Sequence, residues 1–172
     1  MVKDIDCTIF VARSDLNFIS DTLPDLLRLA SRPNSKIQVN LDTTTPTGFL
    51  GTNLNQSTLV EIKGKLENIQ KNHYFNLVQS KFSREETLKL STAAMGSSYP
   101  PTHCFRGYPI LDSFKQFTDS YADYILHFDC DMIFYEAPHF SWIEEGIRVM
   151  EENEDILCVL PKGGPPTKDG SL

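Results

Sequence analysis

Short apolar runs alternate with segments of helical periodicity along this chain, and this alternation restricts the fold more than any other feature. The apolar runs are rich in Ile, Val, Leu and Phe and lack strict alternation with polar residues, which is typical of parallel strands covered on both faces. Strands that alternate with helices indicate an α/β fold, with a mostly parallel central sheet and helices on both faces. We expect strands at residues 7–12, 36–41, 74–79, 124–128 and 156–160.

Several helices have readable starts. Three segments carry a capping box, in which a Ser or Thr side chain and a Glu three residues later each bond a free backbone N–H. The capping-box pairs are Thr58 with Glu61, Ser83 with Glu86, and Ser141 with Glu144. Gly96 is a candidate stop for the second of these helices.

Two further helices involve proline. Residues 18–30 read as a helix that either starts late or kinks at Pro24. Residues 109–121 read as a helix that begins with Pro109, which suits a first turn. One apolar stripe of this helix is formed by Ile110, Phe114, Phe117 and Tyr121.

Composition narrows the classes of function. The chain has 172 residues, which suits one domain, and a net charge of -7, which disfavours nonspecific binding to nucleic acid. No apolar stretch approaches a membrane span and the first residues lack a signal-peptide pattern, so we expect a cytoplasmic protein in which peripheral membrane contact stays open. Neither the four cysteines nor His103 and His139 show the spacing of a zinc site.

The segment "YILHFDCD" places Asp129 and Asp131 at the end of an apolar strand. Ligands of open parallel sheets bind beyond the carboxyl ends of the strands, and side chains two apart in an extended chain point the same way. We expect Cys130 to point into the packing and both carboxylates to converge on Mg²⁺ or Mn²⁺, which would in turn hold a diphosphate. The alternative is that the two acids cap a loop or line a solvated edge. His127 shares their face, but these ions prefer oxygen ligands.

At this point the sequence resembles the metal-dependent nucleotide-sugar glycosyltransferases of the GT-A fold, particularly the family 2-like group. Three segments carry the resemblance: "CTIFVARSDLNFISDTLPDLLRLA", "KIQVNLDTTTP" and "FRGYPILDSFKQFTDSYADYILHFDCDMIFYEAP". They look like the first strand, loop and helix, the second strand ending in an acid, and the helix leading into the D-x-D strand. The runs "VARSD" and "DTTTP" depart from the family's pattern at the base-binding contacts.

The resemblance implies roles for the acids. Asp129 looks like the acid near the ribose or the metal-bound diphosphate, and Asp131 like the acid that ligates the metal. Asp42 matches the acid that hydrogen-bonds the base, although from the sequence alone it could equally be an Asx-turn residue in a Thr-rich loop.

The resemblance also implies a nucleotide pocket lined by Ala12 and Arg13, with Arg106 and Gly107 near the nucleotide. An arginine near a helix start suits a phosphate, because it adds a charge-assisted hydrogen bond to the free N–H groups of the helix. Arg13 and Arg106 could equally be ordinary surface arginines.

We therefore expect a glycosyltransferase that moves a sugar from a nucleoside diphosphate donor to an acceptor hydroxyl with Mn²⁺ or Mg²⁺. The resemblance covers about the N-terminal three quarters of the chain and does not include an acceptor-binding half. The chain stops in the loop-like segment "PKGGPPTKDGSL", so we expect a fragment without that half and assign no catalytic base. Two alternatives stay open. One is a phosphatase of the haloacid dehalogenase type, with Asp129 as nucleophile and Asp131 as general acid/base. The other is a noncatalytic nucleotide-binding domain.

Overall fold

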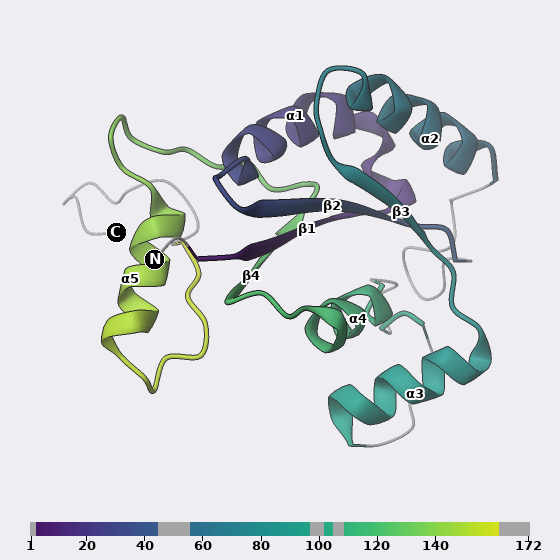
Figure 1. Ribbon diagram of the computed structural model, residues 1–172. Helices are drawn as coiled ribbons and strands as arrows, with labels where there is room; N and C mark the ends of the chain where they lie inside the picture. The colour runs from purple at the N-terminus through teal and green to yellow at the C-terminus, as the bar shows by residue number, and fades with distance from the viewer. Residues whose placement is uncertain (1–2, 45–55, 97–101, 105–108, 162–172) are drawn as a thin grey trace, which may run out of the picture. The chain divides into compact units, whose positions relative to one another are not determined.

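A four-stranded sheet forms the centre of the fold (Figure 1). The structure is a computed structural model and describes residues 3–44, 56–96, 102–104 and 109–161. All strand pairs are parallel, and the strand order is β3-β2-β1-β4. The strands are β1 (Ile5–Val11), β2 (Ser35–Asp42), β3 (Asn76–Ser80) and β4 (Tyr124–Asp129). The predicted α/β class and four of the five predicted strands are confirmed.

The strand order contains one reversal. The chain steps from β1 to β2 to β3 in one direction and then returns to the other side of β1 with β4. Asp42 pairs in register with Ser80, and Phe10 pairs with Asp129, so all four carboxyl ends meet at one edge. Because the chain continues from β1 to β2 on one side and later adds β4 on the other side of β1, the edge between β1 and β4 is the topological switch point at which ligands of such sheets bind.

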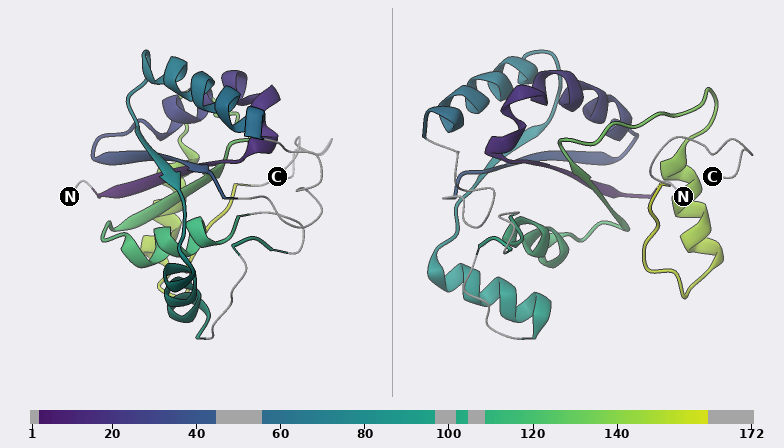
Figure 2. Two further views of the ribbon diagram at one scale, coloured as in Figure 1. Left: turned by 90° about the vertical axis from the view of Figure 1, so that its right-hand side faces the viewer. Right: turned by 180° about the vertical axis from the view of Figure 1, so that it is seen from behind.

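Helices cover both faces of the sheet (Figures 1 and 2). One face carries α1 (Ile19–Ala30) and α2 (Gln56–Gln70), and the other carries α3 (Arg84–Met95) and α4 (Leu111–Asp119). A short 3-10 helix, η1 (Arg13–Asn17), follows β1. The fully buried core is formed by aliphatic and aromatic side chains of the strands and of α1, α2 and α4, among them Ile9, Leu23, Val39, Leu66, Leu111 and Phe128.

The predicted helix ends are largely observed. The Ser83–Glu86 capping box is present at α3, and Gly96 ends this helix in the left-handed conformation with φ 69°. The Ser141 side chain accepts a hydrogen bond from the Glu144 N–H, as expected of an N-cap. The prediction for Thr58 is wrong, because α2 already begins at Gln56 and so includes Thr58 in its first turn.

The two helices with prolines agree with expectation only in part. Pro24 lies inside α1, which begins at Ile19 and so does not start late, whereas a kink at Pro24 stays a prediction. Pro109 lies before α4 in an isolated bridge with His103, so it does not begin the helix. The predicted stripe is wrong at its C-terminal half: Phe117 is 63% exposed, and Tyr121 lies beyond the end of the helix and is 98% exposed.

Residues 134–172 form a second compact unit, distinct from Met1–Ile133. Its helix is α5 (Trp142–Glu152), and the Trp142 ring stacks on Phe134 with ring centroids 5.2 Å apart. The predicted strand at 156–160 is wrong, because these residues form no ladder and Leu157 and Leu160 are exposed. An apolar run becomes a strand only where it finds a partner edge, and the described residues give this run none.

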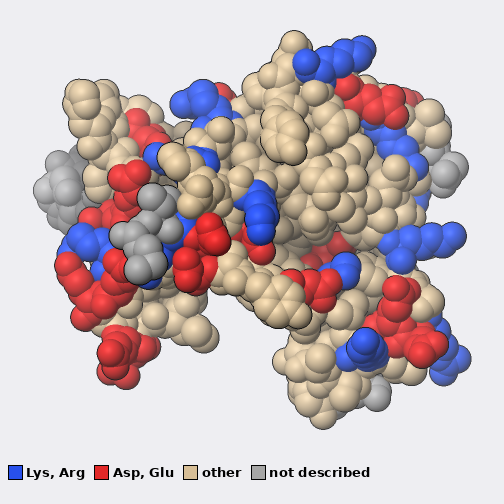
Figure 3. All heavy atoms as spheres, viewed as in Figure 1, with Lys and Arg blue, Asp and Glu red and all other residues tan. Residues whose placement is uncertain are grey.

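The surface carries charges of both signs. On the face shown in Figure 3, Lys and Arg are interspersed with Asp and Glu rather than gathered into one basic area. Within the described residues, no helix combines the length and apolar character that a membrane crossing requires.

Candidate functional site

The D-x-D segment lies at the switch point. Asp129 is the last residue of β4, and Asp131 is exposed in the turn that follows. The Met132 N–H donates to the Asp129 carbonyl at 3.1 Å and closes this turn. Cys130 is buried: its N–H donates to the Phe10 carbonyl at 3.0 Å, and its Sγ lies 3.7 Å from Thr22 Oγ1. The expected alternation is therefore present, with the thiol in the packing and both acids exposed.

His127 lies beside the first acid. Its Nε2 is 3.4 Å from Asp129 Oδ1, and the two side chains are 33% and 56% exposed. Its Nδ1 is 3.3 Å from Gln116 Oε1, while Gln116 Nε2 donates to the Leu126 carbonyl. Gln116 Oε1 and the Asp129 carboxylate are both acceptors, so a neutral ring can donate to only one of them.

Asp15 is a third acid that the sequence reasoning missed. Its carboxylate accepts hydrogen bonds from the Ala12 N–H at 2.8 Å and from Ser14 Oγ at 2.9 Å. Burial raises the pKa of Asp15 to about 6; these hydrogen bonds oppose the rise, and the charges of Asp131 and Asp129 add to it. The loop after β1 thus brings a buried carboxyl into the field of the D-x-D pair. Asp15 binds back to the Ala12 N–H as the acid of a capping box does, but alanine has no side-chain acceptor to complete the box, so the sequence carries only half of that signal.

The two exposed carboxylates at this edge could bind Mg²⁺ or Mn²⁺ only as part of a larger set of ligands. Among the described residues, no group of three or more His, Cys, Asp and Glu is placed to hold a metal ion. The pair Asp129 and Asp131 offers exposed carboxylate oxygens, the hard ligands that these ions prefer. Such a pair suits an ion whose other ligands come from water or from substrate phosphates.

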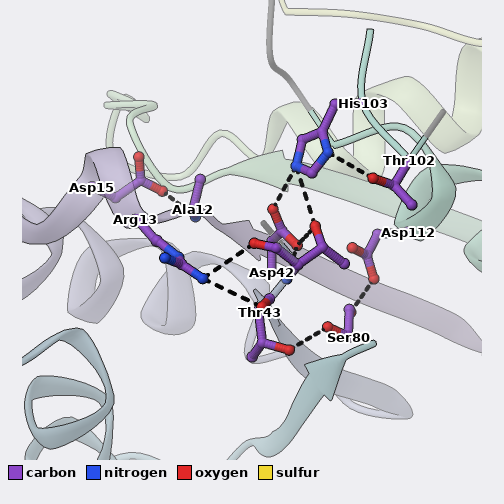
Figure 4. A network of polar contacts seen from close by, with 10 residues as sticks. Ala12, Arg13, Asp15, Asp42, Thr43, Ser80, Thr102, His103 and Asp112 are labelled. Carbon is purple, nitrogen blue, oxygen red and sulfur yellow. Dashed lines mark hydrogen bonds and ion pairs between the residues drawn. The ribbon is translucent and has the colours of Figure 1, made fainter. Parts of the chain in front are cut away.

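Asp42, at the end of β2, belongs to a buried hydrogen-bond network (Figure 4). Its Oδ1 accepts from the Thr44 N–H at 2.9 Å and from Thr44 Oγ1 at 2.5 Å, which is the Asx-turn arrangement left open from the sequence. Its Oδ2 lies 2.9 Å from Nε2 of His103, a buried residue whose Nδ1 lies 2.8 Å from Thr102 Oγ1. Both carboxylate oxygens therefore have protein partners, and the predicted contact of Asp42 with a base stays a prediction.

Arg13 joins the loops after β1 and β2 (Figure 4). It is buried, and its Nη2 donates to the carbonyls of Thr43 at 3.4 Å and Thr44 at 3.2 Å. The alternative interpretation of Arg13 as a surface arginine is therefore wrong, whereas its contact with a nucleotide stays a prediction. Ala12 is half-buried directly before η1, and its part in lining a nucleotide pocket stays a prediction.

A second buried carboxyl connects β3 to α4. Asp112, in the first turn of α4, accepts hydrogen bonds from the Ser80 hydroxyl at the end of β3 and from Asn40 Nδ2 at 3.5 Å. Burial raises the pKa of Asp112 to about 6, the Ser80 hydrogen bond opposes this rise, and the charge of Asp42 adds to it. The remaining predicted site residues, Arg106 and Gly107, lie outside the described residues.

Fold and strand-end geometry together define an α/β protein with a Rossmann-like, all-parallel sheet whose polar residues collect at the carboxyl edge. Comparison with models of protein families finds no match, and neither the curated proteins nor the solved structures contain a chain that matches this one. The family-level resemblance of the sequence is accordingly carried only by the residues quoted above.

Proposed function

We propose that this chain is the donor-binding part of a metal-dependent glycosyltransferase, which binds a nucleoside diphosphate sugar at the carboxyl edge of β1 and β4. One observation carries the proposal: Asp129 and Asp131 lie exposed at the topological switch point, with Cys130 anchoring the segment between them. An acidic pair without a cation would repel an anionic diphosphate, so the proposal requires Mn²⁺ or Mg²⁺ as cofactor.

Each part of the edge has a role in this proposal. Asp129 and Asp131 supply oxygen ligands, and Ala12 and the η1 backbone line the nucleotide side. The bound ion supplies Lewis-acid stabilisation of the negative charge that develops on the departing diphosphate. The chain itself contributes mainly orientation of the donor, since binding in a fixed geometry removes part of the entropic barrier to transfer. The acceptor is an unidentified hydroxyl compound, and no described residue is assigned as general base.

A binding experiment tests the proposal. Thermal unfolding is followed with a panel of nucleoside diphosphates, in Mn²⁺ and in chelator. Mn²⁺ together with at least one diphosphate should stabilise the protein, by about 2.7 kcal/mol at a hundredfold excess over Kd. The stabilisation should disappear in Asp131→Asn and persist in Asp25→Asn, a control at an exposed acid of α1 whose pairing with Arg28 is largely solvated.

Other outcomes would point elsewhere. Equal stabilisation by the diphosphate in chelator would show that no metal bridges protein and ligand. Beryllium fluoride bound to a carboxylate mimics an aspartyl phosphate. If it binds at Asp129 and no nucleotide binds, the phosphatase alternative is supported instead. Diphosphate binding without turnover of any donor sugar would support the noncatalytic alternative.

A further inference from the structure

We infer that His103 is a positioning residue, a buried latch that holds the turn after β2, and through it the Arg13 side chain, in the arrangement that the nucleotide site requires. The part of the inference that concerns diphosphate binding rests on the proposed function. The geometry of the contacts rests on described residues alone. From the sequence alone His103 has no predicted role, because His103 and the neighbouring Cys104 lack the spacing of a metal site.

The first step is the imidazole itself. His103 is 2% exposed, and Nε2 lies 2.9 Å from Asp42 Oδ2 and 3.3 Å from Thr44 Oγ1. A carboxylate only accepts hydrogen bonds, so Nε2 carries the hydrogen in this pair. Nδ1 faces Thr102 Oγ1 at 2.8 Å, which fixes the orientation of the ring from the opposite side. A buried donor held on both sides is suited to fix the position of what it binds.

The second step leads from Asp42 to Arg13. Asp42 Oδ1 holds the backbone N–H and the hydroxyl of Thr44, and the carbonyls of Thr43 and Thr44 accept the Arg13 guanidinium. His103, Asp42, Thr44 and Arg13 therefore form one continuous chain of contacts that joins the ends of β2 and β1. Figure 4 labels His103, Asp42 and Arg13 in this chain. Loss of the His103 donor leaves the buried Asp42 oxygen without its N–H partner. The turn that binds Arg13 then loses one of its restraints and keeps the hydrogen bonds from Thr43 to the Ser80 carbonyl.

The third step is the connection that bears His103. His103 bridges to Pro109, and the Ile110 N–H donates to the Thr102 carbonyl at 3.1 Å, directly before α4. In the first turn of α4, Asp112 binds Ser80 at the end of β3. The His103 imidazole thus contacts Asp42 at the end of β2, and the Asp112 carboxyl contacts Ser80 at the end of β3. Together with the Arg13 contacts, they join the ends of β3, β2 and β1.

Two substitutions of His103 distinguish the effect of its hydrogen bonds from the effect of its side-chain volume. His103→Phe keeps a ring of similar size but removes both nitrogens, whereas His103→Gln keeps an amide N–H donor able to take the place of Nε2–H. The probes are the Mn²⁺ complex of the tightest-binding nucleoside diphosphate of the panel and amide hydrogen exchange. His73→Phe, at a partly exposed histidine outside the network, is the matched control.

We expect His103→Phe to weaken diphosphate binding about tenfold and to speed exchange of the Thr44 amide, with no change at the Cys130 amide between β1 and β4. His103→Gln should restore binding to within about twofold of wild type. Should His103→Phe fail to fold, Thr102→Val, which removes only the support of Nδ1, should give smaller changes in the same direction.

The outcomes distinguish this inference from the proposed function. If the wild type binds no diphosphate, the proposed function fails, and exchange at Thr44 still decides whether the latch exists. Unchanged Thr44 exchange in both His103→Phe and Thr102→Val overturns the latch. Faster exchange with undiminished diphosphate binding overturns its positioning role.

Discussion

At the scale of single residues, two buried carboxyls make stability depend on pH in an unusual direction. Burial raises the pKa of both Asp112 and Asp15 to about 6, above the value of about 4 expected in the unfolded chain. A raised carboxyl pKa means that the fold favours the protonated form. The stabilisation is fully present below pH 4 and is lost as pH rises through 6.

The first prediction concerns Asp112. Asparagine accepts the same hydrogen bonds but does not ionise, so Asp112→Asn should gain stability relative to wild type as pH rises from 4 to 7. The gain should reach at most about 3 kcal/mol, since the shift is about two pKa units. Urea unfolding at several pH values measures the difference. If the difference in unfolding free energy between wild type and variant does not change over this pH range, Asp112 does not titrate in the folded protein.

The second prediction concerns cysteine reactivity. Cys7 and Cys130 are buried, and desolvation raises the pKa of each thiol to about 12, whereas Cys158 is exposed. Because the thiolate is the nucleophile, iodoacetamide at pH 8 should label Cys158 in the native protein and leave Cys7 and Cys130 unlabelled until denaturant is added. Mass spectrometry of the digested protein gives the result. Native labelling of Cys130 as fast as that of Cys158 would contradict the packing assigned to the D-x-D segment.

At the scale of elements, helix α3 depends on its ends more than on its packing. Only two of its residues, Thr87 and Ser91, are buried, while the Ser83 side chain accepts the Glu86 N–H at 3.2 Å. The third prediction is that Ser83→Ala destabilises the protein by about 1 kcal/mol. Ser20→Ala, at an exposed position of α1, is the control and should have little effect. The urea midpoint measures both, and an equal effect of the two would show that the cap is dispensable.

The periodicity of the sequence was sufficient for the sheet because strands of a parallel sheet with helices on both faces favour continuous apolar runs, and four of the five predicted runs are the four strands. The prediction of burial on both faces holds best for β1, whereas β3 and β4 each have one buried residue. The periodicity failed at 156–160 because an apolar run does not reveal whether a neighbouring edge exists. It failed at the end of α4 because Phe117 and Tyr121 continue the apolar spacing although the helix ends at Asp119.

Only those features of the candidate site that lie within one short segment of the sequence were predictable. Asp129 and Asp131 follow directly from a strand pattern. The partners of Asp42 and Asp112 do not, because His103 is 61 residues from Asp42 and Ser80 is 32 residues from Asp112. Such contacts exist only once the topology has brought the strand ends together, and one sequence without its topology contains no signal for them.

At the scale of the whole molecule, nearly all of the buried apolar side chains belong to Met1–Ile133. In the second unit, Ile143 is the buried apolar side chain among the described residues, and Tyr135, Phe140 and Leu160 are exposed. A unit this small buries too little surface to be stable alone, whereas the described residues of the first unit form a four-stranded sheet with helices α1 to α4.

The fourth prediction follows from this imbalance. A protein ending at Ile133 should fold, keep the far-ultraviolet circular dichroism of an α/β protein and unfold cooperatively, whereas a peptide of residues 134–172 should be unstructured. Circular dichroism with thermal unfolding of each piece makes the comparison. A truncated protein without a cooperative transition would show that the second unit completes the core of the first.

The two strands that flank β1, β2 and β4, are far apart in the sequence, and this separation affects the order in which the sheet can form. Ile5 pairs with Ser35 on one side and with Tyr124 on the other. On a ribosome, β1, β2 and β3 emerge before β4, so until β4 pairs, the edge of β1 that β4 later covers has unpaired backbone N–H and C=O groups, which can pair with other chains. The strand that covers this edge is also the one that ends in Asp129, so translation delivers the acidic pair and the second partner of β1 together.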